Sequence, residues 1–267
     1  MKNSMFRRLR RSLIDAVWFV SLITAMAASC LAGDKSDSQR PDRPGWYMGR
    51  QIAPTMSASG ADWLTRKSRE REEAPRKLLQ CLDLKPGQIV CDFGCGNGYH
   101  TLQIAHRVGP KGTVYAVDIQ QEMLDLLQQR AKPRGVTNIR PILALPNDPK
   151  LPAGKFDLLL MVDVYHELFE PGSVLSAIHA SLNDEGRVAV VEFREEDANV
   201  PILPLHKMSQ PQVIKELTAN RFKLVGQYDG LPWQHVLLFA REDSPLMEKK
   251  LKHWRPAESD ESHLERP

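Results

Sequence analysis

A glycine-rich loop constrains the fold of this chain more than any other segment. An apolar run at 89–93 contains Asp92 and leads directly into three alternating glycines, Gly94, Gly96 and Gly98, which precede a segment of helical period. Glycine lets the backbone turn sharply and approach a ligand closely, and the first turn of a helix offers unpaired N–H groups. The segment therefore predicts a strand, a tight loop and a helix that together form one side of a binding site.

Apolar runs of strand length alternate with segments of helical period along the middle of the chain. This alternation is typical of a doubly wound α/β domain with a mostly parallel sheet. The last two runs are joined by 228–232, a segment too short for a helical crossover, so the final strand should be antiparallel to its neighbour. We therefore predict a Rossmann-like, seven-stranded sheet with an antiparallel last strand. The predicted strands are 89–93, 113–117, 138–143, 156–162, 187–193, 222–227 and 235–240, and the predicted helices are 99–108, 122–132, one with Val174, Ile178 and Leu182 on one face, and one from Ser209, where Gln212 completes a capping-box pattern.

A second carboxylate follows the second predicted strand. Asp118 lies about twenty residues after the glycine loop, where a carboxylate can accept both hydroxyls of a ribose. A turn without a ligand would explain the glycines, but not Asp92 and Asp118 at the ends of adjacent strands. This combination resembles the class I S-adenosylmethionine-dependent methyltransferases over residues 77–240. The loop also departs from the G-x-G-x-x-G pattern of nicotinamide dehydrogenases.

The resemblance implies S-adenosyl-L-methionine as the cofactor and gives roles to residues of this chain. In that family the glycine loop passes the methionine moiety, the second acidic residue holds the ribose, and a polar loop after the third strand flanks the adenine. We assign to cofactor binding Asp92, Gly94, Gly96, Gly98, Asp118, Asp148 and Asp163, the last of which follows the fourth strand.

A further group of polar residues is predicted at the same edge of the sheet. His166 and Glu167 follow the fourth strand, Glu192 ends the fifth, and His235 opens the antiparallel seventh. Open α/β sheets bind ligands at this edge, so we predict these four as the catalytic residues. His166 is the first choice for a general base, because imidazole titrates nearest neutral pH, and Glu167 or Glu192 would orient it.

Two other interpretations of this group stay open. Its members could serve only as structural hydrogen-bond partners. Together with His206, in the loop after the fifth strand, the group also contains residue types that ligate metals. Because such ligands are widely dispersed in the sequence, the pattern assigns no metal site.

The ends of the chain differ in character from its middle. Residues 1–33 combine a basic segment with an apolar run that ends in small residues, as in a signal peptide or membrane anchor, and this favours an exported or anchored protein. A mis-called start codon would instead leave a cytoplasmic protein. We predict a linker at 34–60, a methyltransferase domain at 61–240 and a charged, disordered or loosely attached tail at 241–267. A cap helix at 62–81 carries an Arg/Glu block that is either a solvated face or a cover over a ligand cleft.

Composition and net charge exclude some classes of chain and some kinds of binding partner. Apolar residues at 42% and charged residues at 26% are typical of a globular chain and exclude a collagen-like or wholly disordered one. The net charge is +3, but the leader alone carries five basic residues against one acidic residue, so we expect no nucleic-acid-binding surface on the rest. We predict methyl transfer from S-adenosyl-L-methionine to an unidentified small molecule, with membrane association only through the N-terminal segment. A module that binds the same cofactor without turnover is the alternative.

Overall fold

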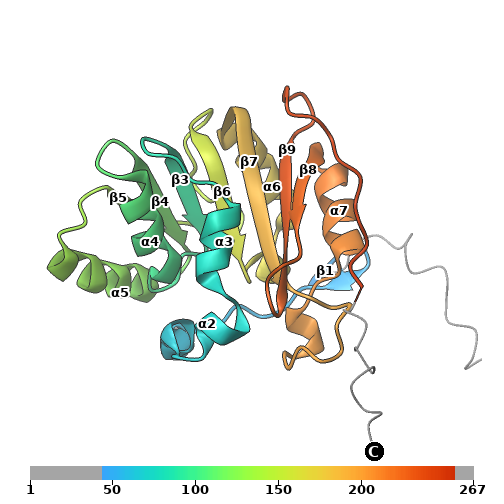
Figure 1. Cartoon of the computed structure of the whole chain (residues 1–267), viewed down its shortest axis with the longest axis horizontal. Helices are drawn as coiled ribbons and strands as arrows, with labels where there is room; N and C mark the ends of the chain where they lie inside the picture. The colour runs from blue at the N-terminus through green and yellow to red at the C-terminus, as the bar shows by residue number, and fades with distance from the viewer. Residues whose placement is uncertain (1–43, 256–267) are drawn as a thin grey trace, which may run out of the picture. The chain divides into compact units, whose positions relative to one another are not determined.

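The central sheet has seven strands in the order β5-β4-β3-β6-β7-β9-β8 (Figure 1). It belongs to a computed structural model that describes residues 44–255. Strands β3 to β7 pair in parallel, and β9 lies antiparallel between β7 and β8. The predicted Rossmann-like sheet with an antiparallel last strand is therefore confirmed. The strands are β3 (Ile89–Phe93), β4 (Thr113–Asp118), β5 (Ile139–Leu143), β6 (Phe156–Val162), β7 (Leu182–Phe193), β8 (Phe222–Tyr228) and β9 (Gln234–Arg241).

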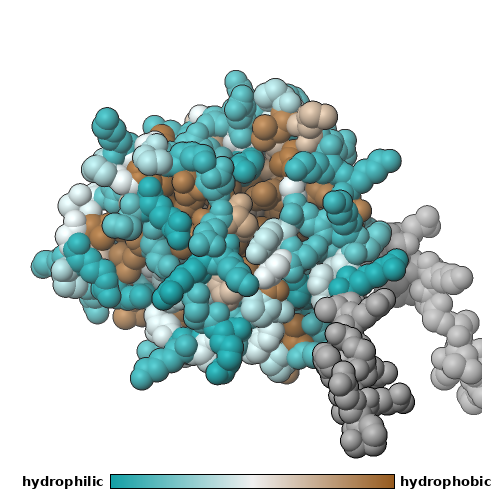
Figure 2. Space-filling model, viewed as in Figure 1, coloured by the Kyte–Doolittle hydropathy of each residue, from teal (hydrophilic) through white to brown (hydrophobic). Residues whose placement is uncertain are grey.

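Helices cover both faces of this sheet. Ile104 of α4 packs in one apolar cluster with Val90 and Leu158, whereas Ile178 of α6 packs in another with Leu159 on the opposite face. Polar side chains of the helices point to solvent: on the face seen in Figure 2, apolar side chains show mainly in the gaps between polar ones. One face carries α3 (Pro75–Cys81), α4 (Tyr99–Val108) and α5 (Gln121–Ala131), and the other carries α6 (Pro171–Ser181) and α7 (Gln210–Ala219).

The prediction of one continuous cap helix at 62–81 is wrong. The structure has three short helices there instead, η2 (Ala58–Thr65), α2 (Arg69–Glu72) and α3. Ala74 takes a left-handed conformation with φ 47° directly before Pro75, the first residue of α3. A proline disfavours helical conformation in the residue before it and lacks the N–H that a continuing helix needs. The chain therefore bends at this point.

Two local predictions around the second half of the sheet also need correction. β7 begins at Leu182 rather than at 187. Leu182, which was predicted on one face of the preceding helix, is therefore the first residue of β7 and not part of α6. Ser209 precedes α7 but makes no side-chain capping bond. The Gln212 amide instead donates to Glu216, and Pro211 has no N–H to offer the cap.

The chain divides into two units after Arg50. In the first, the structure describes only residues 44–50, which include β1 (Trp46–Tyr47); β2 (Arg50–Gln51) follows. The predicted leader at 1–33, the linker up to 43 and the tail from 256 lie outside the described residues. Among residues 44–255, no helix combines the length and apolarity needed to cross a membrane.

Segments predicted as linker and tail make defined contacts where the structure describes them. The buried Ala53 donates its N–H to the carbonyl of His166. In the tail, Lys249 N donates to Leu224 O at 2.7 Å, and the ring of Trp254 lies under the guanidinium of Arg194. Residues 51–60 and 242–255 therefore contact the sheet domain, because their scattered apolar and amide groups find partners there.

Candidate active site

A cleft of about 840 Å³ opens at the carboxyl ends of β3, β4, β6 and β7. This is the edge at which open α/β sheets bind ligands. The residues assigned from the sequence that line it are Gly94, Gly96, Asp118, Asp163, His166 and Glu167, and His206 of the metal interpretation lines it as well. The structure thus brings most of the predicted cofactor and catalytic residues to one place.

The glycine loop forms one wall of the cleft at close range. Gly94 has φ 70°, and a Cβ at this position would lie 2.4 Å from Val164 Cγ2. The N–H groups of Gly94 and Cys95 both donate to Val117 O, which ties the loop to β4. Gly98 does not line the cleft; it caps α4 in a left-handed conformation, and a Cβ there would lie 2.2 Å from Leu127 Cδ1. Gly98 therefore serves the strand-to-helix turn, and its assignment to direct cofactor contact is not supported.

Asp118 fixes the loop in addition to facing the cleft. Its Oδ2 accepts the N–H of Gly96 at 2.9 Å, and its Oδ1 accepts the N–H of Gln120 at 3.0 Å. Only 7% of the residue is exposed, and burial raises the pKa of its carboxyl. Each carboxylate oxygen has a second lone pair, so both can still accept a bond from a ligand hydroxyl.

Asp92 lies behind the loop and not in the cleft. It is buried beneath α4, where its Oδ2 accepts the hydroxyl of Thr101. Burial raises the pKa of Asp92 to about 6, with the nearby Asp118 carboxylate adding to the effect and Arg69 opposing it. The structure gives Asp92 a supporting place under the loop rather than the predicted direct contact.

This raised pKa predicts a pH-dependent effect of Asp92→Asn on stability. The folded protein binds the proton more tightly than the unfolded chain, whose aspartate pKa is 3.8, so stability falls as the pH rises from about 4 to 6. At pH values above that range, a difference of about two pKa units lowers the free energy of unfolding by roughly 3 kcal/mol. Thermal melts of the cofactor-free protein should show Asp92→Asn several degrees more stable than wild type at pH 7.5 and equal to it near pH 4. A variant that is less stable at both pH values would contradict this.

The other two assigned aspartates differ sharply in position. Asp163, with φ 54°, lines the cleft, and both of its oxygens accept from Gln234 Nε2 at 2.8 Å. Burial raises its pKa, and the carboxylates of Glu73 and Glu192 raise it further. Asp148 lies outside the cleft in an exposed turn after β5, where its Oδ1 accepts the N–H of Lys150. The predicted adenine contact of Asp148 is therefore not supported.

Four of the histidine and glutamate residues form a connected cluster. His166 Nδ1 lies 2.7 Å from Oε2 of the fully buried Glu192, and His166 Nε2 lies 3.1 Å from His206 Nδ1. Glu167 Oε1 is 3.8 Å from the same Nε2. Burial raises the pKa of Glu167 to about 7, although His166 opposes this. Burial also lowers the pKa of His206.

His235 does not join this cluster at the cleft. It pairs with Glu192 in the β7–β9 register, but it is fully buried, and neither ring nitrogen has a hydrogen-bond partner. Burial lowers its pKa to about 3, and Arg194 adds to this effect. His235 is therefore a neutral side chain inside the sheet layer, and its position outside the cleft does not support the predicted catalytic role.

Sequence reasoning did not single out two charged residues that line the cleft. Arg69 and Glu73 are 4% and 2% exposed, and Arg69 Nε donates to Glu73 Oε2 at 2.6 Å. Arg66 also pairs with Glu73, and Arg69 Nη1 donates to Leu64 O. The dense Arg/Glu block was the signal in the sequence. It was interpreted either as a solvated face or as a cover over a ligand cleft, and the second interpretation fits the positions of Arg69 and Glu73.

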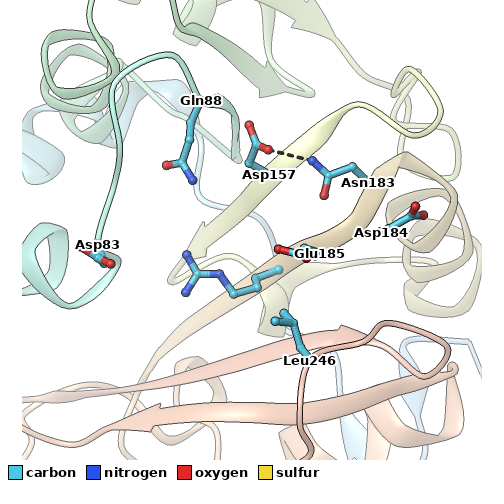
Figure 3. Close-up of a pocket in the computed structure, with 8 residues that line it drawn as sticks. Asp83, Gln88, Asp157, Asn183, Asp184, Glu185 and Leu246 are labelled. Atoms are coloured by element: carbon cyan, nitrogen blue, oxygen red, sulfur yellow. Dashed lines mark hydrogen bonds between the residues drawn. The ribbon is translucent and has the colours of Figure 1, made fainter.

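A second hollow lies at the opposite edge of the sheet, near the amino ends of β6 and β7. Its lining is largely acidic, and Figure 3 shows Asn183 donating to Asp157 Oδ1, at 2.7 Å. Arg187 also lines it and donates to Leu82 O. Because these sheets bind ligands at the carboxyl ends of their strands, the candidate active site is the cleft and not this hollow.

Sequence comparisons point to one family. A family model described as a methyltransferase domain matches residues 84–251, more than half of the chain. The chain is 34% identical over 116 residues to nocamycin O-methyltransferase of Saccharothrix syringae, covering 43% of this chain and 41% of that protein. It is 30% identical over 154 residues to demethylmenaquinone methyltransferase of Lactobacillus johnsonii, covering 57% and 60%. The chain thus spans about half the length of the curated relatives it matches.

Solved structures share the fold at lower identity. A SAM-dependent methyltransferase from Aquifex aeolicus aligns with a TM-score of 0.65 and 24% identity, covering 69% of this chain and 98% of that one. The [4+2]-cyclase SpnF aligns with a TM-score of 0.51 and 15% identity, covering 69% and 81%. These likenesses show the fold alone, and the second shows that the fold by itself does not fix the reaction.

Proposed function

Because the chain belongs to the class I S-adenosylmethionine-dependent methyltransferases, we propose that it methylates a small, largely apolar molecule that loses a proton on methylation, such as a phenol or an enol. The family membership fixes the cofactor and the type of reaction. The acceptor class is the proposal, and it rests on the lining of the cleft.

The residues of the cleft fit S-adenosylmethionine. Gly94 and Gly96 leave the wall without side chains, so a ligand can approach the backbone, and Asp118 offers its carboxylate beside them. Arg69 brings a cation and Glu73 an anion to the same cleft, which match the carboxylate and ammonium of a methionine moiety. The bound cofactor supplies an electrophilic methyl group on a sulfonium.

The exposed apolar side chains around the cleft carry the proposal. Of the seven large hydrophobic residues that are exposed among residues 44–255, five line the cleft. Exposed apolar patches of this kind mark binding sites for apolar ligands. Leu203 is 70% exposed and Phe169 60%, and they lie in the segments after β7 and β6 that also carry His206 and His166. The five residues are Trp63, Ile119, Leu145, Phe169 and Leu203.

The residues of this chain would then divide the work. The apolar side chains around Phe169 and Leu203 would hold the body of the acceptor and exclude water. The His166 cluster would serve the acceptor atom, since it is the group in the cleft suited to assist loss of a proton. Glu192 would keep His166 oriented through Nδ1.

The names of three relatives support a small acceptor. They refer to nocamycin, aklanonic acid and demethylmenaquinone, which are small organic molecules. A fourth relative, at 24% identity, is a protein-L-isoaspartate O-methyltransferase, whose name refers to a protein. The lining of the cleft therefore carries the proposal, and the names only agree with it in part.

The test is a screen of the full chain with S-adenosylmethionine labelled in the methyl group. We expect label transfer to apolar phenols, enols or quinols and none to hydrophilic analogues such as hydroxylated sugars.

Leu203→Glu should raise the KM for the apolar acceptor about tenfold or more, because a charge would meet the acceptor's apolar body, while cofactor affinity stays unchanged. Met247→Glu, which changes an exposed apolar residue outside the cleft, is the matched control. Tight cofactor binding with no transfer to any acceptor would favour the non-catalytic module instead.

A further inference from the structure

We infer that His166, His206 and Glu167 bind a divalent transition-metal ion at the wall of the cleft. The three side chains come from two short helices, η4 (Tyr165–Glu167) and η5 (Pro204–His206), which follow β6 and β7. Their ligand atoms all lie within 4.8 Å of one another. Two imidazoles and one carboxylate are a ligand set that holds zinc or non-haem iron in enzymes.

The spacing of the two histidines fits a shared ion. Bonds of about 2.1 Å that diverge by 90–110° place two ligand nitrogens about 3.0 to 3.4 Å apart. His166 Nε2 and His206 Nδ1 are 3.1 Å apart, within this range. Glu167 Oε1, at 3.8 Å from His166 Nε2, reaches such an ion with a small side-chain rotation.

The surroundings of the three residues give an independent reason. A carboxylate can only accept, so the 2.7 Å bond to Glu192 puts the hydrogen of His166 on Nδ1 and turns the lone pair of Nε2 toward His206. Metal-bound histidines almost always donate their second nitrogen to a carboxylate or carbonyl in this way.

The position of the site suggests what the ion does, and this step rests on the proposed function. All three ligands line the cleft, and three protein ligands leave coordination positions for a substrate. A hydroxyl oxygen of the acceptor bound there would have a lowered pKa and release its proton to solvent. The oxygen then forms a bond to the methyl carbon while the carbon–sulfur bond breaks, and its electron pair stays on sulfur. In this state His166 Nε2 is a ligand and not a base.

The experiment measures Zn²⁺ binding to the tag-free full chain by calorimetry and by metal content after dialysis. We expect one ion per chain. His206→Ala should lower the affinity at least tenfold, and Glu192→Gln should lower it about 10- to 100-fold, as for other residues that hold a metal ligand. His106→Ala, which removes an exposed histidine at the end of α4, is the matched control and should bind as wild type. Calorimetry with S-adenosylhomocysteine should give the same cofactor affinity for all four proteins.

Two results would overturn the inference: no stoichiometric Zn²⁺ binding, or equal binding by wild type and His206→Ala. If His206→Ala does not fold, the visible spectrum of the wild-type protein with Co²⁺ decides. Intense bands of a four- or five-coordinate ion support the site, and the weak spectrum of aqueous Co²⁺ rejects it. Stoichiometric metal binding without methylation of any acceptor would reject the proposed function and leave the metal site standing.

Discussion

Asp118→Ala is expected to weaken S-adenosylmethionine binding on the order of 100-fold or more. Hydrogen bonds to a charged group contribute about 1.5 to 3 kcal/mol each, and two ribose hydroxyls would lose their acceptor. The same substitution removes the acceptor of the Gly96 and Gln120 N–H groups, so the glycine loop loses its anchor as well. Calorimetry with S-adenosylmethionine and S-adenosylhomocysteine measures the loss directly.

Two variants make this result specific. Asp148→Ala changes a carboxylate outside the cleft and should bind the cofactor as wild type does. Asp118→Asn keeps the shape and one acceptor oxygen, so we expect an intermediate loss. Binding by Asp118→Ala within about twofold of wild type would show that the ribose assignment is wrong. A thermal melt checks that the variant is folded, since the carboxylate is buried and accepts two backbone N–H groups of the loop.

The parts of the fold that could be predicted depend on local chemistry. Apolar runs such as 156–162 fill a strand buried on both sides, and the match to β6 is complete. Glycines at positive φ, such as Gly94 and Gly98, mark a turn that other residues resist, so the loop was visible without any knowledge of its surroundings. The antiparallel β9 followed from the shortness of the segment before it.

The sequence could not predict how deeply each side chain at this edge of the sheet is buried. Asp92 and Asp118 both end or nearly end a strand, yet the first lies under α4 against Thr101 and the second faces the cleft. His235 opens its strand at the same edge as the His166 cluster, but its side chain is enclosed. A strand position fixes the edge and the face of the sheet, whereas reaching the cleft depends on packing by distant segments.

The contribution of Arg69 and Glu73 was hidden for a related reason. A block of alternating charges is solvated in most proteins, and nothing local distinguishes one that folds inward. Here the break at Ala74–Pro75 ends the helix, and the segment before it contributes Leu64, Arg69 and Glu73 to the cleft. Only the tertiary fold supplies the burial that makes this ion pair part of the site.

His166→Gln is expected to lower turnover roughly 100-fold or more, the usual contribution of a group that activates an acceptor, with cofactor affinity nearly unchanged. Gln is chosen because its amide N–H can still donate to Glu192, whereas His166→Ala would remove the 2.7 Å bond and leave this buried carboxylate with only the backbone N–H of residue 166. Single-turnover rates with an identified acceptor give the effect on chemistry, and His106→Ala is again the control. This loss is expected whether His166 is a general base or a metal ligand. Chelation of the wild-type protein distinguishes the two roles, because only a metal-bound enzyme should lose activity on chelation and regain it with Zn²⁺. A purely structural His166 predicts a lower melting temperature and unchanged turnover, and that outcome would remove it from the catalytic residues.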